Sequence, residues 1–79
     1  MPAGPTVQPG DSDVIRQAVQ NINAGRYAYA VQGLNTVVSS GRNARWYYLS
    51  ALANYGQGNA ILAMEQIQRA VQMEPGNTV

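Results

Sequence analysis

Residues 46–77 read WYYLSALANYGQGNAILAMEQIQRAVQMEPGN, and this stretch decides the fold. Two helical patterns of apolar residues flank a turn at Gly58, and Pro75 ends the second pattern. The preceding part of the chain aligns with this stretch after a shift of 33 positions. The matched pairs are Ala18 with Ala51, Gly25 with Gly58, Ala30 with Ala63, Leu34 with Ile67, and Val38 with Val71. The chain is therefore predicted to contain two copies of one helix-turn-helix unit, a repeat typical of helical solenoids.

Apolar periodicity and turn residues predict four helices, over residues 14–24, 27–39, 44–57 and from 60 to just before Pro75. Helix starts are expected at an N-cap among residues 11–13, at Asn43 and at Asn59. Short connections between such helices force antiparallel neighbours. The predicted fold class is therefore all-α, with four antiparallel helices arranged as two repeats of an α-α superhelix.

The third and fourth predicted helices carry much of the apolar surface. The third is apolar nearly all round, which indicates packing on two sides or a contact surface. The fourth is expected to bury one face, made of Ala60, Ala63, Met64, Ile67, Ala70 and Val71. In the second helix, Gly33 either permits a close helix contact or is simply tolerated.

Length and composition restrict the classes of function. A chain of 79 residues is one small domain, and without cysteine it has neither a disulfide nor a thiolate metal site. A net charge of +1 is too small to favour binding to nucleic acid. No apolar run approaches the roughly 20 residues that span a membrane, and no signal peptide is recognisable. We expect a cytoplasmic protein, with a flexible linker over residues 1–10 and the helical domain over residues 11–79.

Catalytic chemistry is not expected from this composition. The chain has no histidine and no cysteine, which are the usual bases and nucleophiles near neutral pH. Asp11 and Asp13 stand where a helix begins and are interpreted as capping residues, while Glu65 and Glu74 are interpreted as surface residues. We therefore expect no enzyme activity, no metal site and no cofactor.

The stretch over residues 46–77 resembles a tetratricopeptide repeat, because its opening aromatic residues, Ala51, Gly58, Ala63 and Pro75 follow that motif in order. Residues 14–42 resemble a degenerate copy, and the second unit is placed over residues 44–77. The motif commonly has leucine and tyrosine where this chain has Ser50 and Asn54, so the crossing of the helices is expected to differ locally. Residues 42–59 together with the AVQMEPGN segment are also similar to C-terminal segments of bacterial J-domain proteins.

Resemblance to tetratricopeptide domains implies a protein-interaction module, or more specifically the partner- or substrate-binding arm of a J-domain co-chaperone. It also implies that the first helix of each unit forms the binding face. The candidate binding residues are Ile15, Val19, Ile22, Arg45, Tyr48, Leu52 and Tyr55. Such a face would take a protein or peptide with apolar anchors. Three alternatives remain open at this point. These side chains fill the core, or the chain is a structural dimerisation or spacer domain that forms a weak homodimer, or it is a regulatory domain of an enzyme encoded elsewhere in a longer chain.

Overall fold

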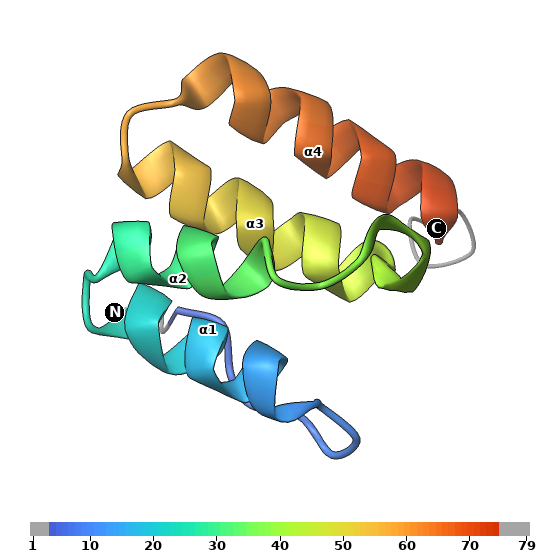
Figure 1. Cartoon of the computed structure of the whole chain (residues 1–79). Helices are drawn as coiled ribbons and strands as arrows, with labels where there is room; N and C mark the ends of the chain where they lie inside the picture. Colours follow the sequence, from blue (N-terminus) through green and yellow to red (C-terminus); the bar gives the residue numbers. More distant parts are fainter. Residues whose placement is uncertain (1–3, 75–79) are drawn as a thin grey trace.

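The computed structural model describes residues 4–74, and within them the protein is all-helical. The helices are α1 (Asp13–Asn23), α2 (Tyr27–Leu34), α3 (Ala44–Gly56) and α4 (Ala60–Met73), with a short 3₁₀ helix, η1 (Ser39–Gly41), between α2 and α3. Figure 1 shows that successive helices run antiparallel. The predicted all-α fold class is therefore confirmed. The predicted stop at Pro75 and the last part of the second unit lie outside the described residues.

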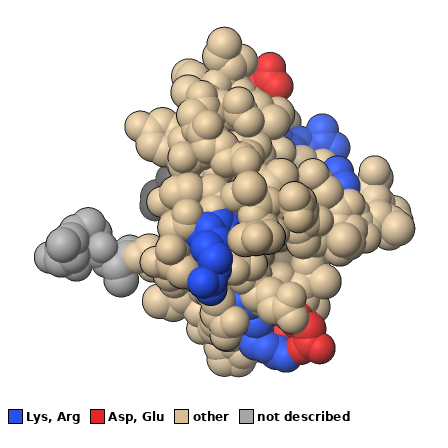
Figure 2. All heavy atoms as spheres, turned by 60° about the vertical axis from the view of Figure 1, so that its left-hand side comes forward, with Lys and Arg blue, Asp and Glu red and all other residues tan. Residues whose placement is uncertain are grey.

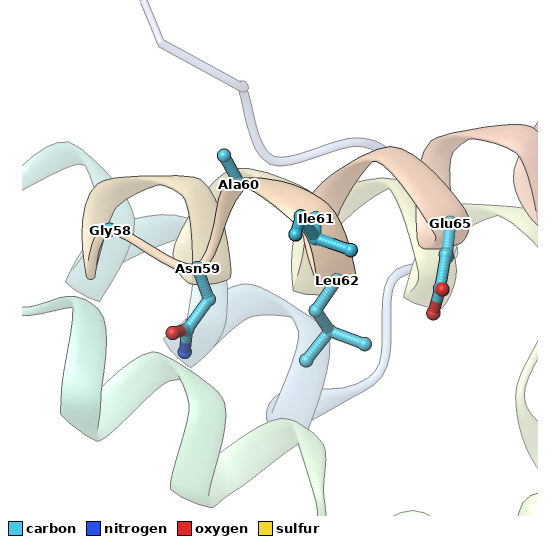
Figure 3. Close-up of a pocket in the computed structure, with 6 residues that line it drawn as sticks. All are labelled: Gly58, Asn59, Ala60, Ile61, Leu62 and Glu65. Carbon is cyan, nitrogen blue, oxygen red and sulfur yellow. The ribbon is translucent and has the colours of Figure 1, made fainter.

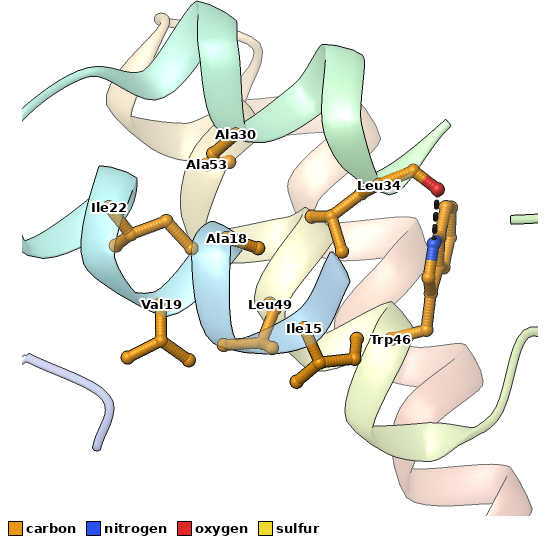
Figure 4. Packing of buried hydrophobic residues seen from close by; sticks show 9 residues of the cluster. All are labelled: Ile15, Ala18, Val19, Ile22, Ala30, Leu34, Trp46, Leu49 and Ala53. Atoms are coloured by element: carbon orange, nitrogen blue, oxygen red, sulfur yellow. Dashed lines mark hydrogen bonds between the residues drawn. The ribbon is translucent and has the colours of Figure 1, made fainter. Parts of the chain in front are cut away.

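α3 is the central helix of the molecule. It packs against α1, α2 and α4, whereas α4 packs on α3 alone among the helices (Figure 1). One cluster of buried side chains joins α1, α2 and α3 (Figure 4). Its members are Ile15, Ala18, Val19, Ile22, Ala30, Leu34, Trp46, Leu49 and Ala53. Because α4 does not contribute to this cluster, the core lies in the first three helices.

Trp46 closes one end of this core. Its side chain is only 2% exposed, and its indole Nε1–H donates a hydrogen bond of 2.7 Å to the carbonyl of Leu34 (Figure 4). The Arg42 guanidinium lies 4.2 Å from the centre of the indole ring, and the Tyr47 ring meets the indole edge-on at 4.9 Å. Aromatic burial and a satisfied indole N–H together make Trp46 a major anchor of α3.

The end of α2 differs from the prediction. We expected a helix over residues 27–39, but α2 ends at Leu34. Side chains take the carbonyls that a longer helix would have used: the Thr36 hydroxyl donates to Gly33, and Arg42 Nε donates to Val37. The indole of Trp46 takes the Leu34 carbonyl in the same way. Since three consecutive β-branched residues also follow Asn35 in the sequence, these side-chain contacts outweigh the weak helix propensity there.

The starts of α3 and α4 allow a matched test of helix capping. The Asn43 side chain accepts a hydrogen bond of 2.9 Å from the amide of Trp46, whereas Asn59 at the start of α4 makes no side-chain capping bond. We expect Asn43→Ala to lower the free energy of unfolding by about 1 kcal/mol, and Asn59→Ala to lower it much less. Urea denaturation followed by circular dichroism measures both. Equal losses in the two variants would contradict the assignment of the caps.

Gly33 can be replaced by a larger residue, whereas Gly25 is required by its backbone conformation. A Cβ added to Gly33 would meet no atom within 4 Å, so this glycine is tolerated and makes no close helix contact. Gly25, which follows α1, has a φ of +78° that other residues rarely adopt. We therefore expect Gly33→Ala to raise the free energy of unfolding by about 0.5–1 kcal/mol and Gly25→Ala to lower it by about 1 kcal/mol. Thermal and urea unfolding measure both changes, and a destabilised Gly33→Ala variant would show that α2 needs this glycine.

A buried polar contact joins α3 to α4. Ser50 and Asn54 are both buried, and the Asn54 amide nitrogen donates to the Ser50 carbonyl at 3.0 Å and to Gln66 Oε1 at 3.1 Å. Asn54 therefore links the two helices through Gln66, whereas Ser50 accepts from Asn54 within α3. Satisfying these groups removes the penalty that buried amides otherwise carry.

Candidate protein-binding groove

An open apolar groove of about 290 Å³ lies between α3 and α4. Its walls consist only of apolar and aromatic side chains, with no charged residue among them. They are Ala51, Leu52 and Tyr55 from α3 and Ala60, Ala63, Met64 and Ile67 from α4. Because α4 packs on α3 alone, no other helix of the described residues 4–74 covers this groove. We call the surface formed by these seven residues the α3/α4 groove.

The apolar surface continues towards the end of α4. A neighbouring hollow of about 590 Å³ is lined by Tyr48 of α3 and by Ala70, Val71 and Glu74, together with Gln8 of the N-terminal segment and Ala44 and Arg45 at the start of α3. Tyr48 and Val71 are both substantially exposed. Exposed apolar side chains of both helices therefore extend from the groove to this hollow, where the polar side chains of Gln8, Arg45 and Glu74 border them.

Only part of the predicted binding face lines this groove. Leu52 and Tyr55 belong to its walls, and Tyr48 borders it. Ile15, Val19 and Ile22 of α1 instead belong to the buried core cluster, where they pack with α2 and α3 (Figure 4). For these three residues, the structure favours the alternative in which the side chains fill the core. The physical reason is that α2 and α3 both pack against the face of α1 that they form.

The sequence-based description of α4 is wrong in one respect. We expected its apolar stripe to be buried, but only Ala63 is buried, and Met64, Ile67 and Val71 are exposed. Met64 exposes 63% of its surface. The periodicity correctly placed these residues on one face of a helix, but it could not reveal that nothing in the described residues covers that face. Consequently Met64 and Ile67, which were assigned to the core, are groove residues.

Arg45, the remaining candidate, is held by the N-terminal segment. Its Nη2 donates to the Thr6 carbonyl at 2.6 Å and to Asp11 Oδ2 at 3.1 Å. The Asn23 amide at the end of α1 donates to the Pro5 carbonyl at 2.7 Å. Residues 4–10, expected to be flexible linker, therefore follow α1 and contact α3 in the structure (Figure 1). Arg45 positions this segment, and its charge is already paired with that of Asp11.

The contacts of Asp11 make its contribution to the stability of the fold dependent on pH. The backbone N–H of Gln8 and the Arg45 guanidinium donate to the Asp11 carboxylate, and they hold its pKa below the ordinary value of 3.8. The ionised carboxylate therefore stabilises the fold above the ordinary pKa, and this contribution is lost as the pH falls through the lowered pKa.

We expect Asp11→Asn to be less stable than the unchanged protein at pH 7, and we expect the difference to shrink as the pH falls below about 3.8. Urea unfolding at pH 7 and at pH 3 measures it. Glu65→Gln removes the same charge from the surface of α4 and serves as the control. A difference that is equal at both pH values would mean that the charge of Asp11 is not what stabilises the N-terminal segment.

A second, larger hollow does not have the features of a binding site. It measures about 670 Å³ and lies at the start of α4, where Gly58, Asn59, Ile61, Leu62 and Glu65 line it with Ala60. All six residues come from one short segment, and Figure 3 shows their side chains pointing in different directions. No polar groups converge there. The hollow is a shallow surface beside one helix, so the groove between two helices is the better candidate.

The described residues hold no group of three or more acidic, histidine or cysteine side chains that could bind a metal ion. Within residues 4–74, every helix is too short or too polar to cross a membrane.

Comparisons with known proteins found no matching family model, no matching curated protein and no matching solved structure. The geometry of the groove is therefore the best indication of function.

Proposed function

We propose that the protein is a non-enzymatic protein-interaction module of the tetratricopeptide type, and that the α3/α4 groove is its binding site. The observation that carries this proposal is the apolar groove between α3 and α4, which no other helix of residues 4–74 covers. Contiguous apolar surface of this kind is characteristic of sites that bind other proteins. The partner is expected to be a protein or peptide with apolar anchors.

The distribution of charge supports an apolar mode of recognition. Figure 2 shows a surface on which arginine and acidic side chains form small, separate patches among uncharged residues. The groove itself contains no ionisable acid or base apart from the tyrosine hydroxyl. Burial of apolar surface, rather than electrostatic attraction, must therefore supply most of the binding free energy. A partner surface rich in charge would lose hydration without gaining an ion pair.

The resemblances narrow the proposal. The module is assigned as a C-terminal partner- or substrate-binding arm of a J-domain co-chaperone acting in the cytoplasm. The second candidate function is a structural dimerisation or spacer domain. The same exposed groove favours dimerisation, because a homodimer would bury it by pairing α3 and α4 of two copies.

Sedimentation equilibrium over a wide concentration range separates the two functions. A binding module is expected to remain monomeric, with Met64→Glu and Ile61→Glu sedimenting like the unchanged protein. Met64 lines the groove, whereas Ile61, exposed by 79%, lies outside it on the same helix. A dimer that Met64→Glu dissociates and Ile61→Glu does not would overturn the proposal in favour of dimerisation.

A further inference from the structure

The internal repeat relates the α3/α4 groove to the groove between α1 and α2, which is occupied in the same molecule. Each of its seven wall residues lies 33 positions after a residue of α1 or α2. The counterparts are Ala18, Val19, Ile22, Tyr27, Ala30, Val31 and Leu34. Five of them belong to the buried core, and Tyr27 and Val31 are packed against it. The groove between α1 and α2 is therefore the equivalent site.

α3 occupies that equivalent site. It packs on both α1 and α2, and it presents Trp46, Leu49 and Ala53 to them (Figure 4). These positions, i, i+3 and i+7, form one face of a helix. The empty groove is also continuous with this interface, because Leu52 is packed against the core cluster and lines the groove as well. The packing of α3 on α1 and α2 is therefore a template for a helix that would bind in the empty α3/α4 groove.

We infer that the α3/α4 groove binds a single amphipathic helix from a partner protein, docked as α3 docks on α1 and α2. This inference deepens the proposed function and rests on it. The helix carries apolar anchors at i, i+3, i+7 and i+10, with no charge on that face, since the groove offers no partner for one. The differences between the two grooves specify what each anchor should be.

The third anchor must be small. In the occupied groove, Ala53 of α3 and Ala30 of α2 are both fully buried, and the counterpart of Ala30 in the empty groove is again an alanine, Ala63. Small residues at both places indicate that the helix backbones approach closely there. A leucine at i+7 of the partner helix would be forced against α4.

The fourth anchor can be large. In the occupied groove this position is Gly56, where an added Cβ would lie 2.5 Å from Cδ1 of Tyr27. The empty groove has Ala60 in place of Tyr27. The space that the tyrosine ring fills in one groove is left vacant in the other, so a leucine at i+10 of the partner helix should fit and bury its side chain.

The first anchor needs no hydrogen-bonding group. Trp46 donates to the carbonyl of Leu34 because α2 ends at that residue. Ile67 is the counterpart of Leu34, and it lies inside α4, which continues to Met73. The carbonyl of Ile67 therefore accepts a hydrogen bond within the helix. Phenylalanine should therefore serve at position i as well as tryptophan does. The partner helix thus reads Phe at i, Leu at i+3, Ala at i+7 and Leu at i+10.

Three synthetic helices test the inference. One has these four anchors and Glu, Lys and Gln at all other positions; the second has Leu at i+7, and the third has Ala at i+10. We measure dissociation constants by fluorescence anisotropy of labelled peptides with the full 79-residue chain. The first helix should bind best, and each of the others should bind about tenfold more weakly. Met64→Glu should weaken binding of the first helix by a similar factor, and Ile61→Glu should leave it unchanged.

The outcomes distinguish this inference from the proposed function. If all three helices bind equally and Met64→Glu weakens them all, the groove is a protein-binding site, but the α3-like docking is overturned. Binding that is insensitive to Met64→Glu, or the absence of binding by any of the helices to a monomeric protein, also overturns the inference. The proposed function itself fails only if sedimentation shows that the groove is closed by a second copy.

Discussion

Replacing Trp46 with alanine is expected to unfold most of the protein at room temperature. The side chain is almost completely buried, and truncating a buried tryptophan typically costs about 3–5 kcal/mol. The core of a domain of this size rarely supplies more than about that amount. The variant also loses the hydrogen bond to Leu34 and the contact with the Arg42 guanidinium. Urea denaturation followed by far-ultraviolet circular dichroism is the appropriate measurement, because the variant lacks the tryptophan fluorophore.

Two controls separate the parts of this effect. Trp46→Phe keeps an aromatic ring and removes the indole N–H, so it should retain a folded domain and lose about 1 kcal/mol or somewhat more. Tyr55→Ala removes an aromatic residue of α3 that is 70% exposed, and we expect a change within about 0.5 kcal/mol. If Trp46→Ala were as stable as Tyr55→Ala, Trp46 would not be the anchor that holds α3 on α2.

Local signals in the sequence were sufficient for most of the helix boundaries. α3 was predicted over residues 44–57 and spans Ala44–Gly56, because Asn43 provides a cap and the turn at Gly58 has a positive φ. α2 was predicted too long, because its end depends on side chains of Arg42 and Trp46 that reach it from outside the helix. Periodicity within one helix carries no information about such contacts.

The candidate site was predicted only in part, for a related reason. An apolar stripe shows that a face can be buried, but it does not show whether another element covers it. Val19 and Met64 both belong to such stripes, yet Val19 is buried in the core cluster and Met64 is exposed. Arg45 was assigned to recognition because it lies beside the face formed by the first helix of its unit, whereas in the structure it is paired with Asp11, 34 positions away. Only the three-dimensional arrangement distinguishes these cases.

Substituting Ala53 by leucine is expected to be the most damaging change after the loss of Trp46. Ala53 and Ala30 are fully buried members of the same cluster, and Figure 4 shows them together where α2 crosses α3. Three additional carbon atoms cannot be accommodated there without moving the helices apart. Overpacking of this kind costs about 1–3 kcal/mol, which is a large fraction of the stability of a small domain. The same denaturation experiment measures the loss.

Ala60→Leu is the matched control, because it makes the same substitution in a helix with the same propensity change, at an exposed position that borders the empty groove. It should change the free energy of unfolding by no more than about 0.5 kcal/mol. A stable Ala53→Leu variant would mean that the helices do not approach closely at this alanine. The requirement for a small third anchor in the partner helix would then lose its template, because Ala30 and Ala63 occupy equivalent positions in the two repeats. Close approach of α2 and α3 at Ala53 is therefore the structural premise shared by the fold and the proposed recognition of a helix.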